Sequence, residues 1–221
     1  MKNQVKRCKG GLLHLVKIPK QKAFSVEKQV IKVLEKGKGI LNYKKSIEIV
    51  IFSSLKEFVI PEIGIVGHAL SQGDIVINID FSRKDIKNII DKWLPSAIYH
   101  ELSHVVRENT AGGCYDTLLD ALITEGIACY AEKEICGMNL PYIKPIKREK
   151  EFWKKAKTKL CRKKYNYNEW FFGSKKLPRW IGYRLGYLIV SSFMQENRNI
   201  SLAKLVRTKS KIILKRSDIK W

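Results

Sequence analysis

The five-residue run HELSH at positions 100–104 constrains the fold more than any other feature of the sequence. Its two histidines, His100 and His104, are four residues apart, so they share one face only if the segment is helical. On a helix both imidazoles can approach one metal ion, and neutral imidazole is a common zinc ligand. Glu101 projects to the side of that face, where it can reach a water molecule on the metal but not the metal itself. We therefore expect a metal-binding helix that begins at Pro95, a residue type favoured at the first helical position.

A third metal ligand has to come from an acidic residue or a cysteine, because His104 is the last histidine of the chain. Glu108 continues the same helical face, but it lies one turn beyond a metal already held by the two histidines. Glu125 lies 21 residues after His104, inside the run LITEGIA, which reads as part of a second helix. The small residues Gly126 and Ala128 would let this helix approach the HELSH helix closely. We predict Glu125 as the third ligand, and the alternative is an exposed helical glutamate.

Strand patterns occur early in the chain and helical patterns dominate later, which favours an α+β fold. We expect a single domain over residues 1–221, with an N-terminal α/β lobe to about residue 93 and a helical lobe from about residue 94 that carries the HELSH helix. The predicted strands are residues 46–52 and 73–80. The predicted helices, besides the HELSH helix, are residues 26–41, 82–93, 116–136, 147–164, 178–197 and 201–209.

The chain is strongly basic overall, because 43 Lys and Arg residues against 21 Asp and Glu residues give a formal net charge of +22. The charge is uneven: residues 95–143 hold two bases and seven acids, whereas residues 144–221 hold 23 bases and five acids. An acidic segment inside a basic protein is what a site for a divalent cation needs. The basic remainder has two interpretations. It forms solvated lysine-rich faces, which we favour, or it contacts an acidic partner such as nucleic acid or an anionic surface.

The HELSH run, followed about twenty residues later by a Glu-Gly-apolar-Ala segment, resembles the gluzincin metallopeptidases. The closer resemblance is to the YjaZ-like predicted Zn-dependent protease family. Three segments carry it: residues 99–107 (YHELSHVVR), 118–128 (LLDALITEGIA) and 180–187 (WIGYRLGY). The resemblance extends over roughly residues 60–195 and implies a zincin-like fold with one zinc ion per chain.

The chemistry that this resemblance implies is zinc-dependent hydrolysis of a peptide or protein substrate. His100, His104 and Glu125 would hold the metal, which activates water at neutral pH. Glu101 would be the general base that accepts the proton of the attacking water.

One position departs from the thermolysin-like branch of these enzymes. There an Asp four residues after the ligand Glu orients a histidine, whereas this chain has Cys129 at that place. Asp120, which lies earlier on the same predicted helix, is a candidate substitute. The residues that orient the metal ligands therefore stay open.

Four further residues are candidates for supporting roles in such a site. Tyr183 and Arg184 would donate a hydrogen bond to the oxyanion of the attacked carbonyl, although packing is the common role for residues of an apolar helix. Arg107 is expected to form an internal ion pair with a nearby acid rather than to contact substrate. His68 lies in a glycine-rich segment before a predicted strand, where it is a candidate active-site residue.

In zinc peptidases of this kind, an edge strand before the metal-binding helix binds the substrate backbone. Residues 73–80 are the candidate for that strand, with an ordinary interior strand as the alternative. A different class of function is a nucleic-acid-binding module whose basic helix, residues 147–164, carries Phe152 and Trp153. The HELSH run and Glu125 favour the peptidase, because such a module has no need of them. A zincin fold that has lost catalysis and only binds proteins is a third alternative, against which the intact Glu101 argues.

The cysteine count and the hydropathy pattern indicate a cytoplasmic protein. The five cysteines are odd in number and include no Cys-x-x-Cys pair, which is typical of reduced thiols inside the cell. The most apolar stretch, residues 180–194, is shorter than the roughly 20 residues that span a bilayer, and Arg184 interrupts it. We expect no transmembrane segment, and no feature of the sequence indicates an oligomeric state.

Overall fold

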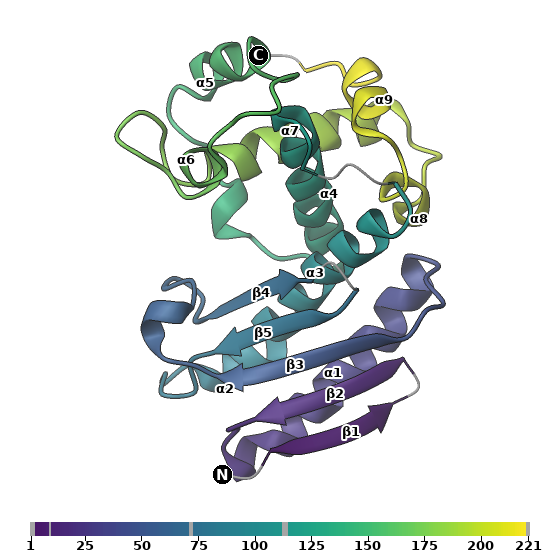
Figure 1. Cartoon of the computed structure of the whole chain (residues 1–221), viewed down its shortest axis with the longest axis vertical. Coiled ribbons are helices and arrows are strands. Elements are labelled where there is room, and N and C mark those ends of the chain that lie inside the picture. Colours follow the sequence, from purple (N-terminus) through teal and green to yellow (C-terminus); the bar gives the residue numbers. More distant parts are fainter. Residues whose placement is uncertain (1–2, 9, 71–72, 112–114, 220–221) are drawn as a thin grey trace. The chain divides into compact units, whose positions relative to one another are not determined.

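One mixed β-sheet of five strands forms the N-terminal part of the computed structural model (Figure 1). The structure describes residues 3–8, 10–70, 73–111 and 115–219. The strands, in their order across the sheet, are β1 (Gln4–Cys8), β2 (Gly11–Val16), β3 (Ile47–Ser53), β5 (Ile75–Ile79) and β4 (Ile65–Ala69). The central strands β2, β3 and β5 run parallel, while β1 and β4 pair antiparallel at the two edges. Helices follow in the C-terminal half, so the predicted α+β class is confirmed.

The strands predicted at residues 46–52 and 73–80 are confirmed as β3 and β5. Side chains alternate along β5, and its three isoleucines lie on the buried side, inaccessible to solvent. Because β5 lies between β3 and β4, the edge position proposed for residues 73–80 is wrong, and the alternative of an ordinary interior strand is confirmed. The edge is formed by β4, whose sequence IVGHA lacks a clear strand pattern because Gly67 and His68 interrupt its apolar residues.

α1 (Lys20–Ile40) and α3 (Leu94–Glu108) pack against each other, and α3 also packs on β4 and β5. α1 confirms the first predicted helix, although it begins earlier in the chain than expected. Gly37 permits the close contact with α3, since a β-carbon there would lie 2.6 Å from the Cδ2 atom of Leu102. The sheet, α1 and α3 belong to one compact unit, residues 1–109, which therefore includes the HELSH helix. The boundary expected near residue 93 would have placed the HELSH helix in the second lobe.

The chain enters α3 without a break, through α2 (Ile86–Asn88) and a π-helical turn at Ile89–Trp93. Pro95 has no N–H group to donate, and in a regular α-helix its ring would collide with the carbonyl four residues earlier. The wider π-turn immediately before Pro95 accommodates the proline without ending the helix. The predicted helix start at Ser82 is wrong, because its hydroxyl and N–H group donate to Asp80 Oδ1, over 2.5 and 2.9 Å, in a turn that precedes the helix.

The second compact unit, residues 110–221, is built from helices where the structure describes it. These are α4 (Leu118–Cys136), a 3-10 turn at Pro141–Ile143, α5 (Glu149–Lys157), α6 (Tyr167–Phe171), α7 (Ile181–Glu196), α8 (Leu202–Leu205) and α9 (Ser210–Lys215). α4 and α7 pack on each other at the centre of this unit, and α9 contacts both (Figure 1). No helix among the described residues is long and apolar enough to cross a membrane.

The helices predicted at residues 116–136 and 178–197 are confirmed as α4 and α7. The hydroxyl of Thr117 accepts a hydrogen bond from the N–H group of Asp120 and so caps the start of α4. Gly137 ends α4 in the left-handed region, at a φ of 64°, which is the usual role of glycine after a helix.

α5 is shorter than the helix predicted over residues 147–164, because the chain turns back to α4 after Lys157. The first two N–H groups of α4 donate to the carbonyl oxygens of Arg162 and Leu160, over 3.2 and 3.0 Å. The first N–H groups of a helix have no partner within that helix. The carbonyl oxygens of residues 160 and 162 therefore accept hydrogen bonds from the start of α4, and α5 does not continue through them.

The C-terminal helices also differ from expectation. α8 occupies only part of residues 201–209, where one helix was predicted. The basic tail beyond it contains a further helix, α9, whose Ile213 is inaccessible to solvent. The contact of α9 with α4 and α7 explains why a segment rich in lysine is ordered, because its apolar residues pack on the centre of the unit.

Two glycines bring the backbones of α4 and α7 into contact. A β-carbon on Gly126 would lie 2.3 Å from the carbonyl carbon of Gly186, and one on Gly186 would lie 2.0 Å from the carbonyl oxygen of Leu122. Both distances are far inside van der Waals contact. Gly126 was expected to bring α4 close to the HELSH helix, but its neighbour in the structure is Gly186 of α7.

Alanine at Gly186 or Gly126 should destabilise the protein, because the added methyl group would push α7 away from α4. Overpacking of this kind costs about 1–3 kcal/mol in the free energy of unfolding, and here it acts on rigid backbone atoms. Gly39 in α1 is the matched control, since a β-carbon there would meet nothing within 4 Å. Gly39→Ala should stabilise the protein by up to about 1 kcal/mol, because alanine is the better helix former. Urea unfolding measures both effects, and a Gly186→Ala variant as stable as wild type would contradict the backbone contact.

Candidate metal centre

α3 presents His100 and His104 on one face, one helical turn apart, with their ring centroids separated by 4.9 Å. Ile98, Leu102 and Val105 occupy the other side of α3 and are inaccessible to solvent, as expected for its packing side. Because the apolar face of α3 packs inside the protein, the two imidazoles point away from that face. His104 itself is only 5 % exposed.

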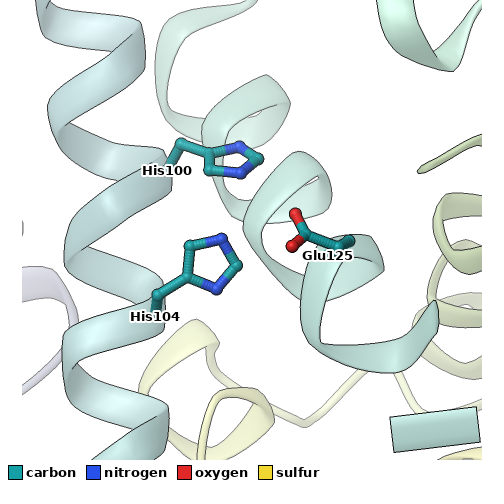
Figure 2. A group of neighbouring side chains, drawn as sticks. All are labelled: His100, His104 and Glu125. Atoms are coloured by element: carbon teal, nitrogen blue, oxygen red, sulfur yellow. The ribbon is translucent and has the colours of Figure 1, made fainter. Parts of the chain in front are cut away.

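Glu125 lies on α4, is 3 % exposed, and points toward the two histidines (Figure 2). His100, His104 and Glu125 each offer one ligand atom, and these atoms all lie within 4.8 Å of one another. Two imidazole nitrogens and one carboxylate oxygen are typical of a catalytic zinc site, in which one coordination position stays open. The structure thus brings together the three residues predicted as ligands, and their donor set fits a zinc ion.

Two tyrosine hydroxyls hold the Glu125 carboxylate, and the sequence predicted neither of them. Tyr115 and Tyr167 donate to the same oxygen, Oε1, over 3.0 and 2.7 Å. Burial raises the pKa of Tyr167, and the charge of Glu125 raises it further, so this hydroxyl keeps its proton and acts as a donor. The tyrosines are 10 and 42 residues away from Glu125 along the chain, and no local pattern indicates such distant contacts.

Glu101, the predicted general base, lies on α3 next to His100 and is 6 % exposed. Its side chain lies against Gly67 of the edge strand β4. A β-carbon on Gly67 would be 2.6 Å from Glu101 Cγ and 2.7 Å from Glu101 Oε1. Glycine at this position of β4 therefore leaves the room that the Glu101 carboxylate occupies.

Glu108, the rejected alternative ligand, lies near the end of α3 and is not part of the group of three. Burial raises the pKa of Glu108, the neighbouring His104 lowers it, and the charge of Glu101 raises it again. Because Glu108 is not among the clustered donors, the structure favours Glu125 as the third donor.

Asp120, Cys129 and Arg107 have defined places in the structure, while the supporting roles predicted for Asp120 and Arg107 stay predictions. Asp120 completes a capping arrangement at the start of α4, where the Thr117 hydroxyl donates to Asp120 Oδ2 over 2.6 Å. Cys129 is a buried cysteine that forms no disulfide with another described cysteine, and it lies one helical turn after Glu125. Arg107 is 1 % exposed and is enclosed by protein on α3.

The three remaining candidates occupy different environments. Arg184 pairs through two nitrogens with Glu149, over 2.7 and 3.1 Å, and donates a third hydrogen bond to a backbone carbonyl over 2.9 Å. Tyr183 packs edge-on against Phe171, with ring centroids 5.1 Å apart. His68 is exposed on the edge strand β4. Arg184 thus has a structural role that occupies its guanidinium group.

A family model described as a predicted Zn-dependent protease (DUF2268) matches residues 26–215. The chain belongs to this family. The match spans the HELSH helix, Glu125 and most of the helical unit, and it agrees with the resemblance to YjaZ-like proteases seen in the sequence. No curated protein matches the chain significantly. Among the described residues, His100, His104 and Glu125 form a group whose donor atoms could hold the metal that the family's description names.

Replacing Glu125 by alanine should lower the zinc affinity of this DUF2268 protein by ~100-fold or more, because a ligand is lost rather than a residue that supports one. Glu108→Ala is the matched control, since it removes a carboxylate from the histidine helix without removing a member of the group, and it should retain zinc. Elemental analysis and competitive titration with a chromophoric chelator measure both. Loss of zinc in Glu108→Ala together with retention in Glu125→Ala would reject this ligand set.

Proposed function

We propose that this protein is a zinc-dependent peptidase with Glu101 as its general base. The observation that carries the proposal is the combination of a His-His-Glu donor set with a shielded carboxylate next to His100 on the same helix. Membership of a family described as predicted Zn-dependent proteases supports the reaction class. We further propose one zinc ion per chain. We also propose action in the cytoplasm, which the reduced state of the described cysteines, none of them in a disulfide, supports.

The residues of the site divide the chemistry between binding and proton transfer. His100, His104 and Glu125 would hold zinc, which activates water and polarises carbonyl groups at neutral pH. The Glu101 carboxylate accepts the proton of the attacking water and then delivers it to the departing amine. Glu101 is only 6 % exposed, so its carboxylate is largely removed from bulk water, in which charge interactions are weaker.

The edge strand β4 supports the binding of an extended peptide beside Glu101. β4 pairs with β5 along one side, and on its other side Ile65 bridges to Ile60, while no strand among the described residues pairs there. Gly67 of β4 contacts the Glu101 side chain, so a peptide added along this strand would pass close to the general base. This proposal transfers the substrate-binding role from β5, where the sequence suggested it, to β4. His68, exposed on the same strand, is a candidate to contact a substrate side chain.

Tyr183 remains our candidate for the second donor to the oxyanion. Its ring packs on Phe171, and Phe171 stacks on Tyr167, the donor to Glu125, so Tyr183 belongs to the surroundings of the site. Arg184, the other predicted donor, is occupied by Glu149. We therefore assign Arg184 no part in the reaction.

The alternative function is binding of nucleic acid or an anionic surface through the basic residues 144–221, with or without proteolysis. On α5 the lysines Lys154, Lys155 and Lys157 are exposed, but Trp153 is 4 % exposed and has no face free to stack on a base. Lys157 lies over the ring of Trp153, 5.8 Å from its centroid, so the helix uses this aromatic within the protein. The peptidase is the better-supported function.

Glu101→Gln should abolish peptide hydrolysis and leave zinc binding unchanged. The amide keeps the shape of the side chain but no longer accepts a proton, so turnover should fall by about 100-fold or more. Glu108→Gln is the matched control and should keep its activity. Cleavage of an unfolded protein substrate, followed by gel electrophoresis and mass spectrometry, gives the rate. Full turnover by Glu101→Gln would reject Glu101 as the base.

Gly67→Ala should reduce hydrolysis while zinc stays bound, because the new methyl group takes the place of the Glu101 carboxylate. A displacement of about 1 Å in a catalytic group lowers the rate by roughly 100-fold. Gly39→Ala adds the same methyl group in open space on α1 and should leave the rate unaltered. Rates and zinc content are measured on the same preparations. Wild-type rates in Gly67→Ala would show that the contact between β4 and Glu101 is irrelevant to catalysis.

A further inference from the structure

We propose that Tyr115 and Tyr167 form a tyrosine clamp that positions the carboxylate of Glu125, so that Glu125 offers its Oε2 oxygen to the metal. Both tyrosines would thus be positioning residues, which act on the metal through a ligand and do not touch it. The inference rests on the proposed function in one respect: the group of His100, His104 and Glu125 has to hold a metal ion.

The two hydroxyls of the tyrosine clamp converge on a single oxygen. Tyr167 donates to Glu125 Oε1 over 2.7 Å, and Tyr115 donates to the same atom over 3.0 Å. A carboxylate oxygen has two lone pairs, so these two donors occupy the accepting capacity of Oε1. With Oε1 engaged by the two hydroxyls, the proposal assigns Oε2 to the metal, and the carboxylate would bind through one oxygen instead of two.

The tyrosine clamp also compensates for the burial of a charge. Glu125 is 3 % exposed, and a carboxylate removed from water loses hydration that only hydrogen bonds or a counter-charge replace. Hydrogen bonds to an ionised acceptor are about twice as strong as those between neutral groups. Two such bonds therefore stabilise the carboxylate in the orientation that the structure shows.

Tyr167 is held independently of Glu125. It is the first residue of α6, and the Asn166 side chain caps that helix by accepting a hydrogen bond from the N–H group of Glu169 over 3.1 Å. The ring of Tyr167 stacks on Phe171, with centroids 4.3 Å apart and an interplanar angle of 20°. The cap and the stacking leave the Tyr167 hydroxyl little freedom to point elsewhere.

Tyr115 is held by the same segment. The hydroxyl of Tyr165 donates to the backbone carbonyl of Tyr115 over 3.1 Å, and the Tyr115 ring packs edge-on against Tyr167 with centroids 5.9 Å apart. Tyr115 and Tyr167, which are distant from each other in sequence, thus meet at the Glu125 carboxylate. The tyrosine clamp is ordered by contacts within its own unit, so it orients Glu125 before any metal arrives.

Removing the clamp should weaken metal binding without removing a ligand. Loss of a residue that orients a metal ligand typically lowers metal affinity by ~10–100-fold. Tyr167→Phe should have the larger effect, because its hydrogen bond is shorter and its ring is stacked. Tyr115→Phe should lower the affinity by up to about 10-fold, because Tyr115 is 37 % exposed and water can replace its hydroxyl.

The test is a Zn²⁺ titration of the full chain after removal of metal by a chelator, with a competing chromophoric chelator as the reporter. The variants are Tyr167→Phe, Tyr115→Phe and, as the matched control, Tyr187→Phe. Tyr187 lies on α7, and its hydroxyl accepts a hydrogen bond from Nζ of Lys133 on α4 over 2.9 Å instead of donating to Glu125, so its loss should leave zinc affinity unchanged. Co²⁺ in place of Zn²⁺ adds a second readout, because its visible absorption reports the geometry of the ligands and should change in Tyr167→Phe.

Each outcome supports or overturns the clamp. Weakened zinc binding and an altered Co²⁺ spectrum in Tyr167→Phe, with Tyr187→Phe like wild type, support it. Wild-type affinity in both Tyr167→Phe and Tyr115→Phe, while Glu125→Ala loses zinc, overturns the clamp and leaves the proposed function intact. Reduced turnover with full zinc affinity in Tyr167→Phe also overturns it, because the hydroxyl would then act on the substrate.

Retention of zinc by Glu125→Ala would instead remove the ligand set of the proposed function. If Tyr167→Phe does not fold, the exposed Tyr115→Phe and its Co²⁺ spectrum decide alone.

Discussion

Burial of the Glu125 carboxylate is the constraint around which the helical unit is organised. A charged group that is 3 % exposed is stable only if its surroundings supply donors, and two tyrosines from separate segments do so. The next residue, Gly126, lies against Gly186 in the backbone contact of α4 and α7. Because adjacent residues of a helix turn together, the glycine contact determines the rotation of α4 and hence the direction of the carboxylate.

In the first unit, too, a close contact at a glycine determines how a helix is oriented. α3 is held on one side by its contact with α1, which Gly37 makes close, and it packs on the sheet near the edge strand β4. The π-turn before Pro95 keeps the approach to α3 helical, so the HELSH run is the continuation of one long rigid element. Small residues stand where backbones or functional side chains approach closely. The candidate site residues therefore lie on rigid helices. A site whose geometry is formed before the ligand binds requires such support.

Much of the site was accessible from local pattern. The helical spacing of His100 and His104, the absence of a later histidine, and the carboxylate in LITEGIA together indicated a group that the structure brings within 4.8 Å. The strands β3 and β5 and the helices α4 and α7 were indicated by periodicity, which depends on backbone geometry alone. The extent of α5 was not predictable, because its end is determined by the donors of α4, whose first residues lie about forty positions earlier in the chain.

The sequence by itself determined the helical presentation of the two histidines and the α+β class, and it indicated Glu125 as the predicted third donor, because each follows from spacing or from residue type. Only the tertiary structure decided that β4 and not β5 forms the sheet edge, that Gly126 meets α7, and that Tyr115 and Tyr167 hold Glu125. The physical reason is the sequence separation of the interacting residues. Residues four apart on a helix lie close together whatever the rest of the chain does. The order of strands in a sheet, and a hydrogen bond between residues 42 positions apart, depend instead on how all the elements pack.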